Sequence, residues 1–143
     1  MTESVLIVDD HVNARIIAQA LLESRGMKVC TAIDGHDACE VLQRADTTIA
    51  VVVMSLDLST QGLNGWELLR RLRGRLEGPP LRTHPRIVVV TSRSEPETER
   101  FARRLGADAF LRAPYPPRDF VLTVEQLVAA DSLDHAQSGA LHR

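Results

Sequence analysis

The sequence is poor in several features that mark specialised classes of protein. Its two cysteines, Cys30 and Cys39, are too few for a disulfide framework and suit a reducing compartment. Aromatic residues make up only 3% of the chain, which argues against a stacking platform for single-stranded nucleic acid. The first residues lack the features of a secretory signal, and the longest apolar run, 49–54, is too short to span a membrane. We therefore expect a cytoplasmic domain without membrane contact.

The composition itself is that of an ordinary globular domain. The 143 residues are 44% hydrophobic and 25% charged with a net charge of -2, and the length predicts a single domain. Charge is nevertheless uneven, because residues 1–67 carry 4 basic and 10 acidic side chains whereas residues 68–112 carry 11 basic and 5 acidic ones. Such an asymmetry marks either a surface for a partner or the solvated faces of helices.

Short apolar runs alternate with segments of helical periodicity along the chain. The predicted strands cover residues 4–8, 27–32, 49–56, 86–91 and 109–112. The predicted helices cover residues 12–24, 36–44, 66–76, 94–106 and 117–130. This alternation predicts an α/β protein, a three-layer sandwich in which helices cover both faces of a parallel sheet. The polar, aperiodic residues 131–143 are expected to form a disordered C-terminal tail.

Side chains suited to phosphoryl chemistry gather at the predicted carboxyl ends of the strands. Asp9 and Asp10 follow the first strand, Asp57 follows the third, and Thr91 ends the fourth. These ends meet in one crevice of an open parallel sheet, where neighbouring carboxylates repel one another unless a cation intervenes. Mg²⁺ takes carboxylate, water and phosphate oxygens, and Asp is a known nucleophile in aspartyl-phosphate chemistry. Each residue taken alone could also be a turn or helix cap, an interpretation that for Asp10 is as good as the functional one, but the convergence of three strand ends favours a site.

Five motifs in order resemble the receiver domain of bacterial two-component response regulators. They are LIVDDH followed by Arg15, GMKVCTAIDG, DLSTQGLNGWELL, TSR and GADAFLRAPY, and they extend over residues 4–130. Asp57 precedes Gly65 by eight residues, and Thr91 precedes Ala113 by 22, as in that family. The resemblance implies a flavodoxin-like (βα)5 fold with a five-stranded sheet of order 2-1-3-4-5, and a receiver domain over residues 1–130.

The resemblance also implies the metal and phosphoryl sites. Asp9, Asp10 and Asp57, with the backbone carbonyl of Ser59, would bind Mg²⁺, and Asp10 would be a direct ligand. Asp57 would be the phosphoacceptor, with phosphate arriving from a sensor histidine kinase, a phosphotransfer protein or a small phosphodonor. The segment before Asp57 is longer than in the family, which leaves Ser55 as an alternative acceptor, but the spacing to the following glycine favours Asp57.

The switch positions implied by the family are Thr91 and Phe110. The Thr91 hydroxyl would bind a phosphoryl oxygen, and Phe110 is either the switch aromatic or a plain core residue. The main departure is Ala113, which stands where the family has a Lys and offers neither charge nor hydrogen-bond donor. The adjacent Arg112 is not expected to substitute, because neighbouring strand residues point to opposite faces. We expect the missing Lys to weaken the coupling of phosphorylation to the switch more than the fold.

Two functions remain open. The first is a phosphorylatable receiver, itself not an enzyme, that signals through an unknown output protein; the family resemblance also allows a homodimer through the fourth helix, fifth strand and fifth helix. The second is a pseudo-receiver that binds proteins independently of phosphorylation, which Ala113 favours and the intact acidic residues oppose. A Mg²⁺-dependent phosphohydrolase is disfavoured, because no second carboxylate stands two residues after Asp57. Too few residues follow residue 130 for a DNA-binding output domain, so direct nucleic-acid binding is not expected.

Overall fold

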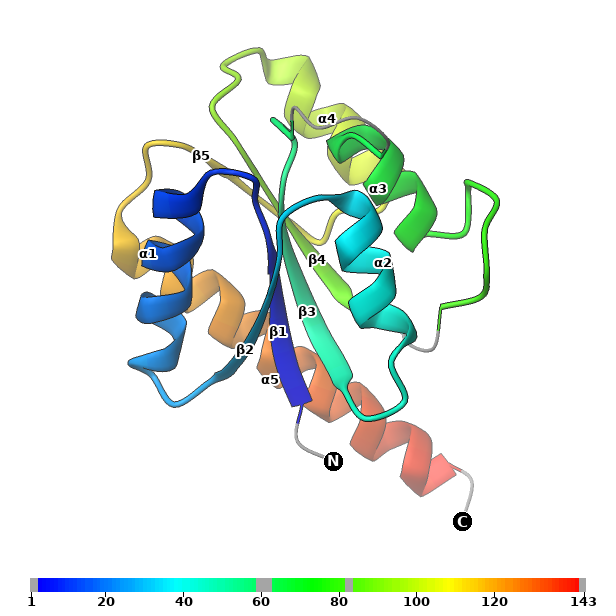
Figure 1. The fold of residues 1–143 in the computed structure, drawn as a ribbon. Coiled ribbons are helices and arrows are strands. Elements are labelled where there is room, and N and C mark those ends of the chain that lie inside the picture. Colours follow the sequence, from blue (N-terminus) through cyan, green and yellow to red (C-terminus); the bar gives the residue numbers. More distant parts are fainter. Residues whose placement is uncertain (1–2, 59–62, 82–83, 142–143) are drawn as a thin grey trace.

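The computed structural model describes residues 3–58, 63–81 and 84–141, and strands and helices alternate along them (Figure 1). The strands in these ranges are β1 (Glu3–Val8), β2 (Lys28–Ala32), β3 (Thr48–Ser55), β4 (Arg86–Thr91) and β5 (Ala109–Arg112). The helices in these ranges are α1 (Val12–Glu23), α2 (Gly35–Gln43), α3 (Gly65–Leu72), α4 (Pro96–Leu105) and α5 (Pro117–Leu141). None of the helices described is both long and apolar enough to cross a membrane.

The strands form one parallel sheet in the order β2-β1-β3-β4-β5, which confirms the predicted topology. Val8 at the end of β1 lies opposite Ala32 of β2 and Met54 of β3. Ser55 at the end of β3 lies opposite Val90 of β4. The residues that follow β1, β3 and β4 therefore leave the sheet at the same edge. The strand order reverses direction between β1 and β3, where open α/β sheets form their binding crevices.

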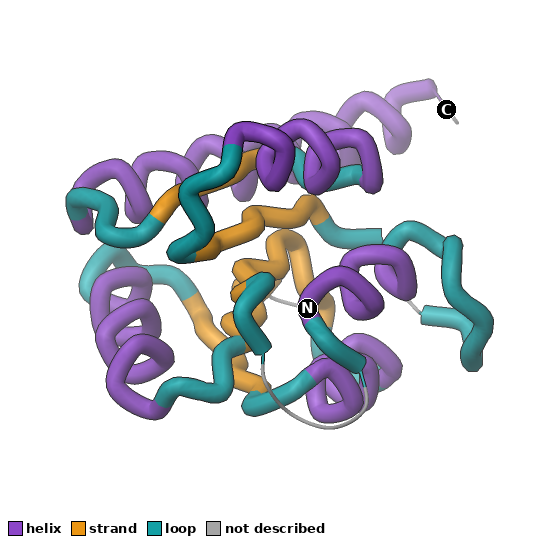
Figure 2. The backbone as a smooth tube through the Cα atoms, turned by 90° about the horizontal axis from the view of Figure 1, so that it is seen from above, coloured by secondary structure: helices purple, strands orange, loops and turns teal. Residues whose placement is uncertain are grey.

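Helices cover both faces of this sheet (Figures 1 and 2). Leu6 and Val8 of β1 pack into the core shared with α2, α3 and α4. Val5 and Ile7, which alternate with them, pack into the core shared with α1 and α5. A strand buried on both faces needs apolar residues at every position, which explains the uninterrupted apolar runs in the sequence.

Local signals set the ends of α3, the helix that follows the site loop. The Asn64 side chain accepts the Glu67 N–H at 2.9 Å, and Glu67 Oε1 accepts the Asn64 N–H at 3.3 Å, forming a capping box. A Cβ on Gly65 would lie 2.5 Å from the Leu56 Cα, so glycine allows α3 to begin directly against the end of β3. The helix ends before the predicted residue 76, because Gly74 turns the chain with a φ of 70°.

The C-terminal segment differs from the predicted disordered tail, because α5 continues to Leu141. The prediction relied on the polar, aperiodic composition after residue 130. In the structure Asp131 is buried, Asp134 forms an ion pair with Arg86 of β4, and His135 lies 3.6 Å from Glu3 of β1. These contacts join the end of α5 to strands that are remote in sequence, and they stabilise the helix beyond residue 130. The local periodicity of the sequence does not reveal them.

Candidate functional site

The carboxylate of Asp57 lies against the carboxyl end of β4. Its Oδ1 accepts a hydrogen bond from Thr91 Oγ1 at 2.9 Å. Its Oδ2 accepts the Ser92 backbone N–H at 2.9 Å and the Ser92 hydroxyl at 3.1 Å. Thr91 is the last residue of β4 and is only 1% exposed, so its hydroxyl has a well-defined position. The adjacent strands β3 and β4 thus bring together Asp57 and Thr91, as the sequence predicted.

The backbone after β3 directs Asp57, rather than Ser55, towards the crevice. Leu56 donates its N–H to the Val90 carbonyl at 2.9 Å, which holds the chain beside β4. The Ser55 hydroxyl is buried and accepts the Asp57 N–H at 3.0 Å. The Asp57 side chain remains 31% exposed. This geometry favours Asp57 as the acceptor, because a buried hydroxyl engaged with the backbone is poorly placed to meet a phosphodonor.

The surroundings of Asp57 lower its pKa below the usual value for an aspartate. Burial is the largest single influence and would raise the pKa. It is outweighed by the combined effect of the Ser92 N–H, the Thr91 and Ser92 hydroxyls and the positive charge of Arg93. The carboxylate is therefore ionised at neutral pH, which is the form required of a nucleophile.

A second acidic group lies at the end of β1. Asp9 Oδ1 accepts the His11 N–H at 2.9 Å, and His11 Nδ1 lies 3.0 Å from Asp10 Oδ1. Asp9, Asp10 and His11 each offer a ligand atom within 4.8 Å of the other two, whereas the groups found among the described residues do not include Asp57. The structure thus shows Asp9, Asp10 and His11 as one group, and Asp57 with Thr91 and Ser92 as another, at the ends of adjacent strands.

The residues at the end of β1 fit a hard divalent cation. The Asp9 and Asp10 side chains are 21% and 11% exposed, so their oxygens are largely shielded but still reachable. Arg15 donates from its guanidinium to the Asp9 backbone carbonyl at 2.9 Å, which steadies this turn. Clustered carboxylate oxygens are the donors that Mg²⁺ prefers. The predicted carbonyl ligand, Ser59, lies outside the described residues, and the set of ligands stays a prediction.

Neither Ala113 nor Arg112 supplies the cation that the family places beside the acceptor. Ala113 donates its N–H to the Thr91 carbonyl at 2.8 Å, and the Ala113–Pro114 bond is cis. Arg112 donates from its guanidinium to the carbonyls of Arg93 and Glu95, each at 3.0 Å. The Arg112 guanidinium is thus engaged with the loop before α4, and its inability to substitute for the missing Lys stays a prediction.

Phe110 is anchored between the core and the surface. It is partly buried against the core shared with α2, α3 and α4. The Arg112 guanidinium lies over its ring, 5.1 Å from the centroid, in a cation–π contact. The core role of Phe110 is therefore observed, and its role as a switch stays a prediction.

Arg93 is the site residue that the sequence analysis missed. Its Nε lies 3.7 Å from Asp57 Oδ1, and its side chain is 53% exposed. Its backbone N–H also donates to Thr91 Oγ1 at 3.1 Å. The only signal was its place in the TSR motif at the end of the fourth predicted strand. A cation thus approaches Asp57 from the loop after β4 instead of from β5.

Comparison with known proteins identifies the family of this chain. The family model "Response regulator receiver domain" matches residues 5–125, and the chain belongs to this family. It is 28% identical over 134 residues to the response regulator SaeR of Staphylococcus aureus strain USA300. That match covers 93% of this chain and 54% of SaeR, so the chain spans about half the length of the curated relatives it matches.

Solved structures show the same fold. The receiver domain of NtrX from Brucella abortus gives a TM-score of 0.76 at 24% identity, over 88% of this chain and 98% of that one. A CheY-like receiver domain protein from Methanospirillum hungatei gives a TM-score of 0.78 at 21% identity, over 94% of this chain and 99% of that one. At these identities the likeness concerns the fold alone.

Proposed function

We propose that this chain is the phosphoacceptor receiver of a two-component signalling system and that Asp57 accepts the phosphoryl group in a Mg²⁺-dependent step. The observation that carries the proposal is the ionised, partly exposed Asp57 carboxylate held by Thr91 and Ser92 beside the acidic end of β1. The phosphodonor would be a sensor histidine kinase or a phosphotransfer protein, in keeping with the response-regulator relatives.

The proposed step is the transfer of one phosphoryl group. An Asp57 carboxylate oxygen attacks phosphorus, the new O–P bond forms, and the donor's P–N or P–O bond breaks, its electron pair leaving with the donor group. When bound by Asp9 and Asp10, Mg²⁺ would supply positive charge to the phosphoryl oxygens. Once one Asp57 oxygen carries the phosphoryl group as an acyl phosphate, the Thr91 hydroxyl and the Ser92 N–H would be positioned to donate to the phosphoryl oxygens instead.

This exchange of hydrogen-bond acceptors would couple phosphorylation to the surface. Thr91 and Ser92 connect β4 to the loop that precedes α4, and Arg112 of β5 donates to the carbonyls of that same loop. We propose that the output passes through protein contacts on α4, β5 and α5, including a homodimer through this face. In this proposal the domain has no enzymatic output, acts in the bacterial cytoplasm and does not itself bind nucleic acid.

The second candidate is a pseudo-receiver that acts independently of phosphorylation. It is favoured by Ala113, because no ammonium group reaches the acceptor from the end of β5. The carboxylates and Thr91 are nevertheless present, and Arg93 brings a positive charge within 3.7 Å of Asp57. These features support the phosphorylatable receiver over the pseudo-receiver.

Acetyl phosphate with Mg²⁺, followed by intact-protein mass spectrometry, separates the two candidates. We expect wild type to gain the mass of one phosphoryl group, Asp57→Asn to gain none, and Ser55→Ala to behave as wild type. A well-folded wild type that gains no adduct would support the pseudo-receiver. Loss of the adduct in Ser55→Ala with retention in Asp57→Asn would transfer the acceptor role to Ser55.

A further inference from the structure

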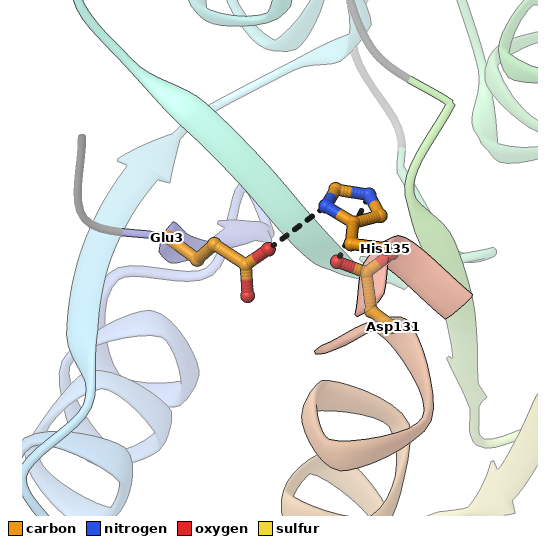
Figure 3. A group of neighbouring side chains, drawn as sticks. All are labelled: Glu3, Asp131 and His135. Atoms are coloured by element: carbon orange, nitrogen blue, oxygen red, sulfur yellow. Dashed lines mark ion pairs between the residues drawn. The ribbon is translucent and has the colours of Figure 1, made fainter. Parts of the chain in front are cut away.

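Glu3, Asp131 and His135 form a second cluster of metal-ligand side chains (Figure 3). Glu3 is the first residue of β1, and Asp131 and His135 lie on the C-terminal part of α5. Figure 3 shows the His135 ring beside both carboxylates, with an ion pair drawn to each. Because the strands are parallel, Glu3 stands at the edge of the sheet opposite the one that carries Asp57.

The possible ligand atoms of this cluster lie close together. His135 Nδ1 lies 3.6 Å from Glu3 Oε1, and His135 Nε2 lies 3.8 Å from Asp131 Oδ2. One ligand atom from each residue lies within 4.8 Å of the other two. Ligand atoms that share a tetrahedral Zn²⁺ at its usual bond lengths lie roughly 3.3 Å apart. The two short contacts use opposite nitrogens of one ring, so a single ion would be bound by one of them, and the ligand atoms would have to approach by up to roughly 1.5 Å to reach that geometry.

Asp131 provides an independent reason to expect a ligand. The residue is only 8% exposed, and its Oδ2 is buried with no hydrogen-bond partner among the residues that the structure describes. His135 at 3.8 Å is too distant to donate a hydrogen bond to it. A buried carboxylate oxygen without a donor is costly, and a coordinated cation removes that cost.

Glu3 increases the need for positive charge at this position. Burial, followed by the neighbouring Asp131 carboxylate, raises the pKa of Glu3. Two carboxylates this close repel each other unless a proton or a cation lies between them. His135 lies beside both carboxylates and adds the nitrogen donor that a metal ion would use.

We propose that Glu3, Asp131 and His135 form a binding site for a borderline divalent transition-metal ion, Zn²⁺ in the first place. Imidazole together with carboxylates suits Zn²⁺, whereas Mg²⁺ and Ca²⁺ favour oxygen donors alone. Asp131 and His135 are four residues apart on one helix and therefore point to the same side, the spacing of known helical zinc ligands. Water would complete the coordination.

The ion can reach the helical ligands from solvent. A cavity of about 280 Å³ opens beside the C-terminal part of α5. Two arginines line it, but Arg73 pairs with Asp108 at 2.8 Å and Arg86 pairs with Asp134. Their charges are thereby balanced and oppose an entering cation only weakly. A bound ion would fasten the end of α5 to the start of β1, and ligand binding to the folded state alone stabilises it.

Titration calorimetry with Zn²⁺ in excess Mg²⁺ tests the site, since Mg²⁺ competes for the carboxylates of Asp9 and Asp10. We expect wild type to bind one Zn²⁺, and His135→Gln and Asp131→Asn to bind it more weakly by about tenfold or more. One control is expected to retain the wild-type affinity, because His11→Gln removes the nitrogen donor of the other acidic cluster and leaves this one unchanged.

Thermal unfolding distinguishes lost binding from lost folding. His135 is an exposed side chain, so His135→Gln is expected to melt with wild type in the absence of Zn²⁺ and, unlike wild type, to gain no stability when Zn²⁺ is added. The proposal is overturned if wild type binds no Zn²⁺, which would leave Glu3 and Asp131 to share a proton. It is also overturned if His11→Gln loses the ion while His135→Gln keeps it.

Discussion

The Thr91 hydroxyl donates a hydrogen bond of 2.9 Å to Asp57 Oδ1 across the carboxyl ends of β3 and β4. Thr91 is buried, whereas the Asp57 side chain is partly exposed. The bond therefore connects a carboxylate that solvent can reach to the interior end of a core strand. A chemical change at Asp57 must alter the partner of this hydroxyl, which makes the pair the natural starting point for experiments.

The first prediction concerns the energy of this bond. Thr91→Val keeps the shape of the side chain and removes the donor, and Asp57→Ala removes the acceptor. In a double-mutant cycle on urea unfolding, we expect a coupling free energy of about 1–2 kcal/mol, because the acceptor is charged and the bond is partly shielded. A coupling near zero would show that the two side chains do not interact in solution.

The second prediction concerns Arg93. Arg93→Gln removes the positive charge 3.7 Å from Asp57 Oδ1. We expect the rate of phosphorylation by acetyl phosphate, measured by mass spectrometry, to fall by about three- to tenfold. A solvent-screened positive charge at this distance attracts negative charge at the acceptor by about 1 kcal/mol, and its loss raises the barrier by that amount. Unfolding is expected to change little, because exposed ion pairs stabilise proteins weakly.

Arg100→Gln is the matched control for Arg93→Gln. Arg100 is an exposed arginine of α4 whose ion pair is with Glu97 rather than with the acceptor. We expect acetyl phosphate to phosphorylate Arg100→Gln at the wild-type rate. Equal slowing of both variants would show that general surface charge, and not the position of Arg93, sets the rate.

The third prediction restores the charge on β5. Ala113→Lys places an ammonium group next to Thr91, whose carbonyl accepts the Ala113 N–H. Introduced into Arg93→Gln, it should recover most of the lost phosphorylation rate, because either residue would supply the cation near Asp57. Ala113→Met adds similar bulk without charge and should recover none. Equal recovery by Lys and Met would attribute the effect to packing.

The fourth prediction concerns Mg²⁺ at Asp9 and Asp10. These carboxylates repel each other, and a bound divalent cation stabilises the folded state by mass action. Millimolar Mg²⁺ should therefore raise the melting temperature of wild type and raise that of Asp10→Asn much less. Wild-type melting curves that coincide with and without Mg²⁺ would contradict the proposed site.

The strands show which parts of the fold can be predicted from residue patterns. β4 and β5 occupy the predicted ranges 86–91 and 109–112, and the largely buried β4 has the uninterrupted apolar run expected of a strand covered on both faces. The contact of Asp57 with Thr91 could likewise be predicted, because parallel strands end at one edge of the sheet. The directions of the acidic side chains could not, because they depend on local contacts such as those of Asp57 with Ser92 and of Asp10 with His11.

The alternation of strands and helices, the parallel sheet and the acidic residues at its edge were determined by the sequence alone, because burial periodicity and residue type are local properties of the chain. The tertiary structure decided that Arg93 is the cation beside Asp57 and that α5 extends beyond residue 130. Both outcomes depend on contacts between distant segments, Arg93 with Asp57 and the end of α5 with β1 and β4. Such contacts form only when the whole chain is folded, so no periodicity within a single segment reveals them.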